Sequence, residues 1–495
     1  MTIEDYTLSE PNRKNCPPMS DSPSQACNNP LLGAACAVVV ACLVAVWSVS
    51  STIPASRCSD WSLTLQRLSK VDNFSSVEMS ADALRSLMSA HAARQPALLN
   101  ILSVISSWNL FENTTAQTRW TPSHICRKMK LLTNVYRSNH PQFLYFSSEK
   151  AFAQLLNLSA SFVTYDVSCK TFVESPRRDG EYLYYSGPVD LSEDLVSDIQ
   201  PQSLPFSHFP KDKQNEVVTN LWMGHANVTT VCHYDADHNV YVQLHGRKRF
   251  ILFPPDDARN LYLHPRPHPS HRQSLVDFSC VDLERFPNFR HARPMDVVLH
   301  PGDVLYIPPF WFHHVVAQDF SISVNAWVRA EELQLQYAAE DLPLPLEATW
   351  SEEASRDATA IFLKDLLHAS LLTSQQSDLK DGWCDPTVAS FVEDIIRRYI
   401  LASPALRRNG TFGSGGACTP NTWRRHYPEI SQGVNFSAKS SARAREVAAH
   451  ILSALPSIRA ILLSSVVERI VSFVVGPENT VPFLSMFLDA CCSRA

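Results

Sequence analysis

The chain has 495 residues and 45% of them are apolar, so it can bury a large core, as one big domain plus a second. A net charge of −6 gives no basic footprint for nucleic acid, and the only compact basic cluster is Arg247-Lys248-Arg249. The 13 cysteines include no Cys-x-x-Cys pair, which argues against a zinc ribbon or a redox motif. Their odd number permits disulfides but leaves at least one thiol, and the sequence does not give the pairing.

The N-terminal region predicts a tail and a membrane anchor. Residues 1–30 are polar and proline-containing, which predicts disorder. Residues 31–50 carry no charge and are mostly apolar, long enough for a helix that crosses a bilayer. A buried core helix is the alternative, but an apolar helix next to a disordered tail has no core to enter. We therefore predict an uncleaved transmembrane signal-anchor, whose flanking basic residues do not settle its orientation.

Glycosylation sequons favour one orientation of this anchor. Six Asn-x-Ser/Thr triplets occur, all after the anchor, at Asn73, Asn113, Asn157, Asn227, Asn409 and Asn435. We set Asn227 aside, because a glycan just before the strand of His233 is expected to clash. The prediction is a single-pass membrane protein of the secretory pathway (endoplasmic reticulum or Golgi), with a short cytosolic tail and its larger portion in the lumen.

The rest of the chain divides into three regions by periodicity. Residues 58–200 predict a helical and mixed flank, with strands near residues 142–146 and 181–185. Residues 201–330 show short β runs broken by Pro and Gly, which is typical of a jelly roll. Residues 331–495 return to helix, with an amphipathic run over residues 442–475 that indicates a packed bundle or a dimer surface.

Two short motifs in the β region point to a metal site. His233 and Asp235 are two residues apart, so on a strand both side chains leave the same face. A third ligand can come from His313 or its neighbour His314, which face opposite ways on a strand. Two imidazoles and one carboxylate suit a non-haem Fe(II) that keeps open positions. The alternative is an ordinary strand histidine beside a turn aspartate.

Residues 221–328 resemble the jumonji-C branch of the cupin superfamily, the Fe(II)- and 2-oxoglutarate-dependent oxygenases. Within that branch they are most similar to the asparaginyl hydroxylase type known as factor inhibiting HIF. The similar blocks follow the order and approximate spacing of the family: residues 249–256, 261–262, 268–269, 272–278, 285–289 and 301–308. The resemblance covers about a third of the chain, and the family pattern Trp-x-His-x-Val selects His313 over His314. It implies a double-stranded β-helix (cupin) core with helical flanks.

The resemblance also implies a cosubstrate pocket for 2-oxoglutarate, besides Fe(II) and O₂. Lys248 matches the lysine that binds the far carboxylate, although it could be one solvated charge of its basic run. Tyr184 and Thr230 resemble residues that share this carboxylate, although either could be strand packing. Three further residues fall near the cosubstrate or the substrate pocket in the family: Asn239, Asn325 and Trp327, the last of which could equally fill the core.

The function implied by the resemblance is hydroxylation of a protein side chain, coupled to decarboxylation of 2-oxoglutarate to succinate. The resembling hydroxylase dimerises through C-terminal helices, so a homodimer through residues 331–495 is one expectation. A tRNA-modifying hydroxylase of the wybutosine type is an alternative, which the acidic charge balance disfavours. A non-catalytic, membrane-tethered binding module is another, and the complete ligand set argues against it. The substrate does not carry over, because the chain departs from the hydroxylase between residues 190 and 220.

Overall fold

The computed structural model describes residues 89–100, 119–175, 180–189, 193–196, 198, 217–347, 349–372, 385–403, 406 and 436–492. The predicted tail (1–30) and membrane anchor (31–50) lie outside these residues. Across the described ranges, no helix combines the length and apolar character needed to cross a bilayer.

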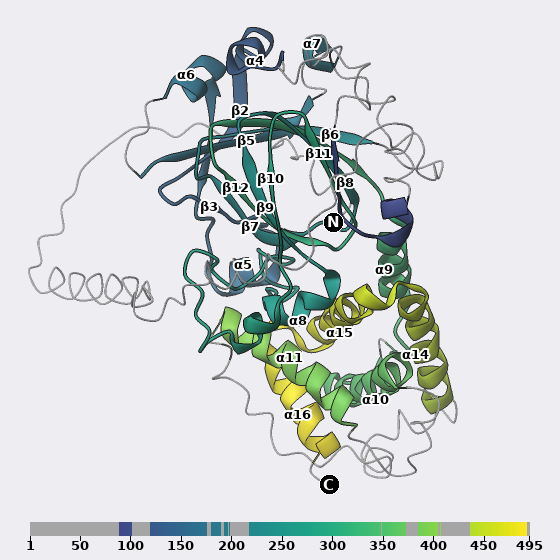
Figure 1. The fold of residues 1–495 in the computed structure, drawn as a ribbon. Coiled ribbons are helices and arrows are strands. Elements are labelled where there is room, and N and C mark those ends of the chain that lie inside the picture. Colours follow the sequence, from purple (N-terminus) through teal and green to yellow (C-terminus); the bar gives the residue numbers. More distant parts are fainter. Residues whose placement is uncertain are drawn as a thin grey trace, which may run out of the picture. The chain divides into compact units, whose positions relative to one another are not determined.

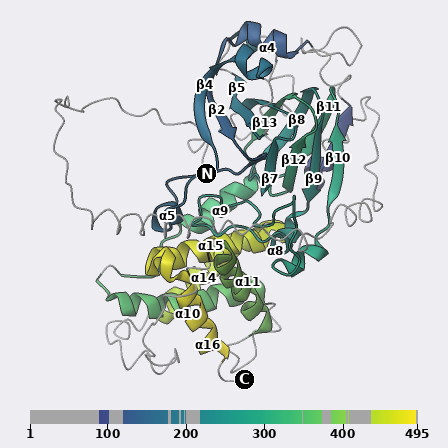
Figure 2. The ribbon, with the colours of Figure 1, turned by 90° about the vertical axis from the view of Figure 1, so that its left-hand side faces the viewer.

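Two antiparallel-rich β-sheets form the centre of the fold (Figures 1 and 2). The larger sheet has the strand order β1 (Ala97–Asn100), β11 (Asp303–Ile307), β8 (His238–His245), β13 (Ser321–Val328), β6 (Val218–Gly224), β5 (Tyr182–Pro188), β2 (Leu131–Ser138), β4 (Val163–Ser168). The smaller sheet has the order β10 (Met295–Leu299), β9 (Lys248–Phe253), β12 (Phe312–Ala317), β7 (Thr229–Tyr234), β3 (Gln142–Phe143). Two such sheets are what the predicted jelly roll requires.

Alternation along β8 shows how the sequence separates the two faces of the larger sheet. Val240, Val242 and Leu244 are buried in the core on its outer face. Between them, Asn239 and Tyr241 point the other way, toward the smaller sheet, because successive strand residues face opposite sides. Polar side chains on a buried inner face are costly unless they hydrogen-bond, so this face is where a site is expected.

The larger sheet extends well before the predicted start of the core at residue 201. Its strands β1, β2, β4 and β5 all come from the predicted N-terminal flank, and β3 of that flank joins the smaller sheet. The helices α4 (Pro122–Lys128) and α6 (Cys169–Glu174) pack with the outer face of the larger sheet, and a disulfide links their Cys126 and Cys169. The predicted strands near residues 142–146 and 181–185 are confirmed as β3 and β5, but local periodicity does not indicate with which strands they pair.

Short helices connect these strands. They are α5 (Ala151–Leu155), α7 (Glu193–Val196), η7 (Pro255–Asp257), α8 (Ala258–Leu261) and η8 (Pro287–His291).

The C-terminal region is helical, as predicted. Its elements are α9 (Glu331–Asp341), α10 (Glu352–Leu371), α11 (Pro386–Ala402), α14 (Phe436–Ser453), η10 (Pro456–Ile458), α15 (Arg459–Val475), η11 (Pro477–Asn479) and α16 (Thr480–Cys492). The amphipathic run over residues 442–475 is two helices, because Pro456 cannot continue α14. One hydrophobic cluster joins α10, α11, α14, α15 and α16 to the outward face of β7 and β12, which supports the packed-bundle alternative. Dimerisation through these helices stays a prediction.

Asn157 and Asn227 are exposed sequon asparagines at turns with positive φ, of 49° and 70°. The expected clash at Asn227 is wrong, since this residue precedes β7 on the surface whereas His233 lies near the other end of that strand. The other four sequons lie outside the described residues.

Candidate metal centre

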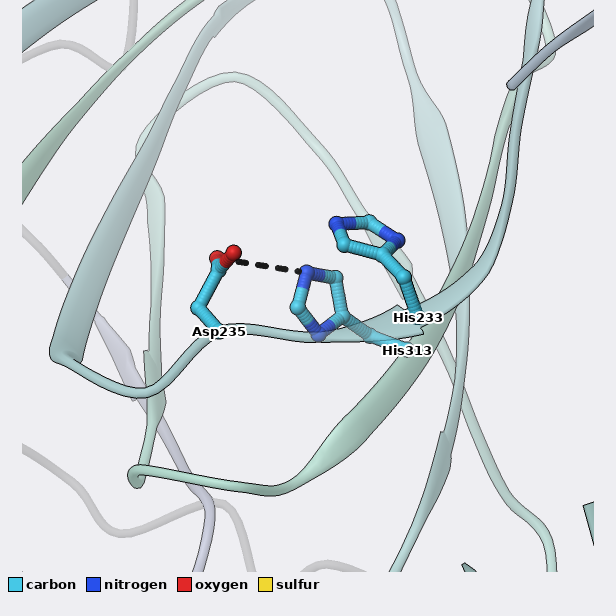
Figure 3. Close-up of side chains that lie close together, drawn as sticks. All are labelled: His233, Asp235 and His313. Carbon is cyan, nitrogen blue, oxygen red and sulfur yellow. Dashed lines mark ion pairs between the residues drawn. The ribbon is translucent and has the colours of Figure 1, made fainter. Parts of the chain in front are cut away.

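The side chains of His233, Asp235 and His313 converge between the two sheets (Figure 3). One potential ligand atom of each lies within 4.8 Å of the others. His233 is on β7 and Asp235 follows that strand directly, while His313 pairs with His233 from β12. The imidazole centroids of the two histidines are 4.2 Å apart, and Nε2 of His313 is 3.7 Å from Oδ2 of Asp235. Among the described residues this is the one group of at least three His, Cys, Asp or Glu side chains that could hold a metal ion.

Backbone carbonyls fix which nitrogen of each imidazole faces the centre. Nδ1 of His233 is 2.7 Å from the Val231 carbonyl oxygen, and Nδ1 of His313 is 3.1 Å from that of Trp311. A neutral imidazole that donates from Nδ1 keeps its Nε2 lone pair for a metal. Burial, followed by the neighbouring His233, lowers the pKa of His313 to about 4, although Asp235 acts in the opposite direction. The ring of His313 is therefore neutral near pH 7.

His314 takes the opposite side of β12. It pairs with Ile251 of β9 and stacks on Phe278, with 4.7 Å between the ring centroids. Its Nδ1 is buried and has no hydrogen-bond partner among the described residues. The structure therefore brings His313, and not His314, to His233 and Asp235.

A directed chain of hydrogen bonds reaches the Asp235 carboxylate from the larger sheet. Trp222 Nε1 donates to Asn325 Oδ1 over 2.6 Å, and Asn325 Nδ2 donates to Asn239 Oδ1 over 3.1 Å. Asn239 Nδ2 then lies 3.4 Å from Oδ2 of Asp235, a long contact at which the amide can still donate. Of the two asparagines that the family resemblance places near the cosubstrate, Asn239 thus contacts Asp235, and Asn325 contacts Asn239. Such partners orient a ligating carboxylate.

Lys248 is the inward member of the basic run. Arg247 and Arg249 form ion pairs with Asp319 and Asp296, whereas the Lys248 side chain is only 4% exposed. Lys248 of β9 pairs with Ala317 of β12, which is four residues beyond His313. The side chains of Lys248 and His313 therefore lie on the same face of the smaller sheet. Burial lowers the pKa of Lys248 to about 7.

Two residues that the sequence did not single out hold this amine. Lys248 Nζ donates to the Tyr241 hydroxyl over 2.6 Å and to Ser323 Oγ over 3.2 Å. The Tyr241 and Ser323 hydroxyls also hydrogen-bond each other. The sequence contained a signal, because Tyr241 is two residues from Asn239 on the same strand and so shares its inward face. An aromatic residue on a strand is ordinarily packing, and that reading concealed it.

Thr230 and Tyr184 meet on the inner face. The Thr230 hydroxyl is 3.4 Å from that of Tyr184, whose pKa is raised by burial. Thr230 is three residues before His233, an odd spacing that would put the two on opposite faces of a regular strand. A β-bulge resolves this, since three residues of β7, from Thr230 to His233, span only two of β12. In the part of the chain that the structure describes, neither Thr230 nor Tyr184 hydrogen-bonds to Lys248.

Trp327 packs edge-on against Trp222, with 5.9 Å between the ring centroids, and pairs with Asn239 of β8. It is therefore next to the residues that orient Asp235. This position is compatible both with a wall of the pocket and with packing.

The donor set fits a divalent transition metal of the iron type. Two imidazoles and one carboxylate converge, which leaves the remaining coordination positions to other ligands. A buried lysine with two hydroxyl neighbours fits a carboxylate on the same inner face. The arrangement can hold a metal and, on the same inner face, a small organic acid.

Comparisons with known proteins agree with this geometry. The model of the cupin-like domain family matches residues 89–333, which includes the strands that precede the predicted core. The human HSPB1-associated protein 1 is 35% identical over 157 residues, 31% of either chain. A Drosophila melanogaster jumonji C domain-containing protein 5 is 30% identical over 167 residues, covering 33% of this chain and 41% of the relative.

The tRNA wybutosine-synthesizing protein 5 of Danio rerio is 38% identical over 97 residues, covering 20% of this chain and 28% of the relative. The chain spans less than half the length of the mammalian HSPB1-associated proteins that it matches. The finer resemblance to the asparaginyl hydroxylase stays a prediction. Residues 89–333 are therefore a cupin-like domain of the jumonji-C type.

Proposed function

We propose that the protein is an Fe(II)- and 2-oxoglutarate-dependent dioxygenase that hydroxylates a side chain of a protein substrate. The observation that carries this proposal is the convergence of His233, Asp235 and His313, with their possible ligand atoms within 4.8 Å of one another. Family membership adds the expectation of oxygenase chemistry.

The protein's own residues supply binding and orientation. His233 and His313 offer Nε2 to the metal because their Nδ1 atoms are engaged by backbone carbonyls. Asn239 orients the Asp235 carboxylate. Lys248, with Tyr241 and Ser323, is placed to hold the far carboxylate of 2-oxoglutarate. When bound, iron and 2-oxoglutarate supply the oxidising power that inserts one oxygen atom of O₂ into a C–H bond, with release of CO₂ and succinate.

A protein substrate is favoured by the resemblance to an asparaginyl hydroxylase and by relatives named for association with the protein HSPB1. A tRNA substrate is the second candidate, favoured by the similarity to a tRNA wybutosine-synthesizing protein. The net charge of −6 disfavours RNA, because sequence-independent binding of nucleic acid depends on basic surface.

Mass spectrometry can decide between the two substrate classes. The full chain is incubated with Fe(II), 2-oxoglutarate and either a proteome-derived peptide library or total tRNA. We expect peptides to gain the mass of one oxygen atom, and the gain to disappear with His313→Ala. The exposed His291→Ala serves as the matched control and keeps the activity. Oxygen transfer to tRNA alone would replace the protein-hydroxylase proposal with the second candidate.

We further propose that the cupin domain lies in the lumen of the secretory pathway, anchored by residues 31–50. The disulfide between Cys126 and Cys169 supports an oxidising compartment, and Cys280 is disulfide-bonded as well. Asn157 and Asn227 are exposed, as acceptors of glycans must be. Glycosidase treatment should increase the gel mobility of the cell-expressed protein, less so after Asn157→Gln and Asn227→Gln. Absence of any glycan together with reduced Cys126 and Cys169 in cells contradicts a lumenal location.

A further inference from the structure

A cavity of about 370 Å³ lies behind the strand that carries the metal-site residues. It is bounded by the outward face of β7, by residues 258–272, and by the helices α11 and α15. Tyr234 lines it, and in sequence Tyr234 stands between His233 and Asp235, whose side chains face the other way. The cavity is therefore distinct from the candidate metal centre, and its volume is in the range of small-molecule sites.

The walls are suited to an apolar ligand body. Aliphatic and aromatic side chains come from both sides of the cavity, and they include Leu263, Leu371, Phe391, Ile395 and Ile461. The mouth is marked by Arg259 and Arg397, whose side chains are 55% and 43% exposed. A small molecule can thus bury an apolar part while a polar part meets charged groups.

The charged groups around the cavity leave a positive excess. Four ion pairs surround it: Arg259 with Asp394 at 2.6 Å, Arg398 with Glu468 at 2.7 Å, Arg266 with Glu340 at 2.8 Å, and Arg397 with Asp394 at 3.8 Å. The remaining arginine of the lining is Arg272. The Arg272 guanidinium is 5.8 Å from the Tyr234 ring centroid and interacts electrostatically with Asp237. The lining thus contains five arginines and two carboxylates, Asp394 and Glu468, and Glu340 and Asp237 outside the lining offset only part of the difference, so the cavity keeps a positive excess.

Two imidazoles on the wall make no hydrogen bond to any residue that the structure describes. They are His264 and His271, and Nδ1 of each is buried. Burial lowers the pKa of both rings well below the ordinary value, so they are neutral near pH 7. A neutral imidazole can donate one hydrogen bond, and a buried polar group without a partner is costly. These rings are therefore suited to donate to a ligand oxygen.

We propose that this cavity binds a small monoanionic carboxylic acid with an apolar body. The apolar walls take the body, and the carboxylate meets the arginine excess and the unpaired imidazoles. This site is separate from the pocket of 2-oxoglutarate, a dianion that is expected at Lys248. The proposal does not depend on the enzymatic activity.

The test uses three probes that share one body and differ in charge: 4-phenylbutyrate, 4-phenylbutan-1-ol and 4-phenylbutylamine. Binding to the full chain is measured by isothermal titration calorimetry. We expect the carboxylate to bind at least about tenfold more tightly than the alcohol, because a hydrogen bond to a charged group contributes more than a neutral one. We expect the amine not to bind. Equal binding of all three probes, or binding of none, overturns the proposal.

Variants locate the bound carboxylate. Ala460 is exposed on α15 and lines the cavity, so Ala460→Phe should fill the space and abolish binding without removing a core contact. Ala449→Phe, at an exposed position of α14 outside the cavity, is the matched control and should bind as the unaltered chain does. Lys248→Met should also keep binding, which separates this site from the 2-oxoglutarate pocket.

If Ala460→Phe does not fold, His271→Leu replaces it, and we expect roughly tenfold weaker binding of the carboxylate with unchanged affinity for the alcohol. Unchanged carboxylate binding in a folded Ala460→Phe or His271→Leu variant, or loss in Lys248→Met, refutes the location.

Discussion

Replacement of Lys248 by methionine should make the fold more stable and cosubstrate binding weaker. The Lys248 amine is buried, and its hydrogen-bond partners among the described residues are the Tyr241 and Ser323 hydroxyls rather than a carboxylate. Methionine keeps much of the volume and removes the charge. Tyr241 and Ser323 are not left without partners, because their hydroxyls hydrogen-bond each other.

The magnitude follows from the pKa of Lys248, which burial lowers from 10.5 to about 7. At 1.36 kcal/mol per pKa unit, holding the charged amine at this buried position costs on the order of several kcal/mol. Because the methionine side chain removes this cost but does not replace every contact of the lysine, we expect Lys248→Met to raise the free energy of unfolding by about 1–3 kcal/mol at pH 7. Loss of a buried, charge-assisted carboxylate contact should raise the KM for 2-oxoglutarate by about 30-fold or more.

The stabilisation also has a predicted pH dependence. Between pH 7 and 10.5 the unfolded chain binds more protons at Lys248 than the folded chain, so the unaltered protein gains stability as the pH rises through this window. The advantage of Lys248→Met is therefore full below pH 7 and disappears toward pH 10.5. Urea unfolding of both proteins at pH 7 and pH 9 measures the difference in stability. Succinate formation at varied concentrations of 2-oxoglutarate measures the KM. A variant that is less stable than the unaltered protein and keeps its KM would refute this reasoning.

Four further predictions concern neighbouring features. The KM for 2-oxoglutarate should rise above pH 7, by up to about tenfold per pH unit, because binding of the carboxylate requires the charged Lys248; a flat KM in the unaltered protein contradicts this. Asn239→Leu should weaken Fe(II) binding by about 10- to 100-fold in a metal titration, since it removes the contact that orients Asp235, and unchanged affinity would deny it that role. His313→Ala should lose iron in an elemental assay while His314→Ala retains it, and the reverse result would exchange their roles. Cys126→Ser should lower the free energy of unfolding by about 4 kcal/mol, as expected for a loop closed across a sequence separation of 43, and no change in denaturant midpoint would show that the disulfide does not contribute.

The sequence located the metal site because its signal is local. His233 and Asp235 need only strand alternation to share a face, and the structure places both with His313. The relation of Thr230 to His233 was not open to the same reasoning, because their spacing of three places them together only through the β-bulge in β7. That bulge is visible only when β7 and β12 are paired.

The parts that sequence reasoning did not anticipate depend on contacts between distant segments. Tyr241 and Ser323 meet Lys248 across the two sheets, from separations of 7 and 75 residues. The predicted strands near residues 142–146 and 181–185 are β3 and β5, but the place of β1 to β5 in the two sheets is decided by long-range pairing, which a local pattern does not show. The cavity behind Tyr234 likewise combines residues 258–272 with α11 and α15, so no single stretch of sequence indicates it.

The central claim is that this chain is an active oxygenase, and its most direct test is succinate formation from 2-oxoglutarate by the full chain with Fe(II) and O₂. We predict turnover that vanishes with His233→Ala and persists with the exposed His291→Ala. A folded chain that neither binds iron nor forms succinate would contradict the claim, and the domain would then be a binding module.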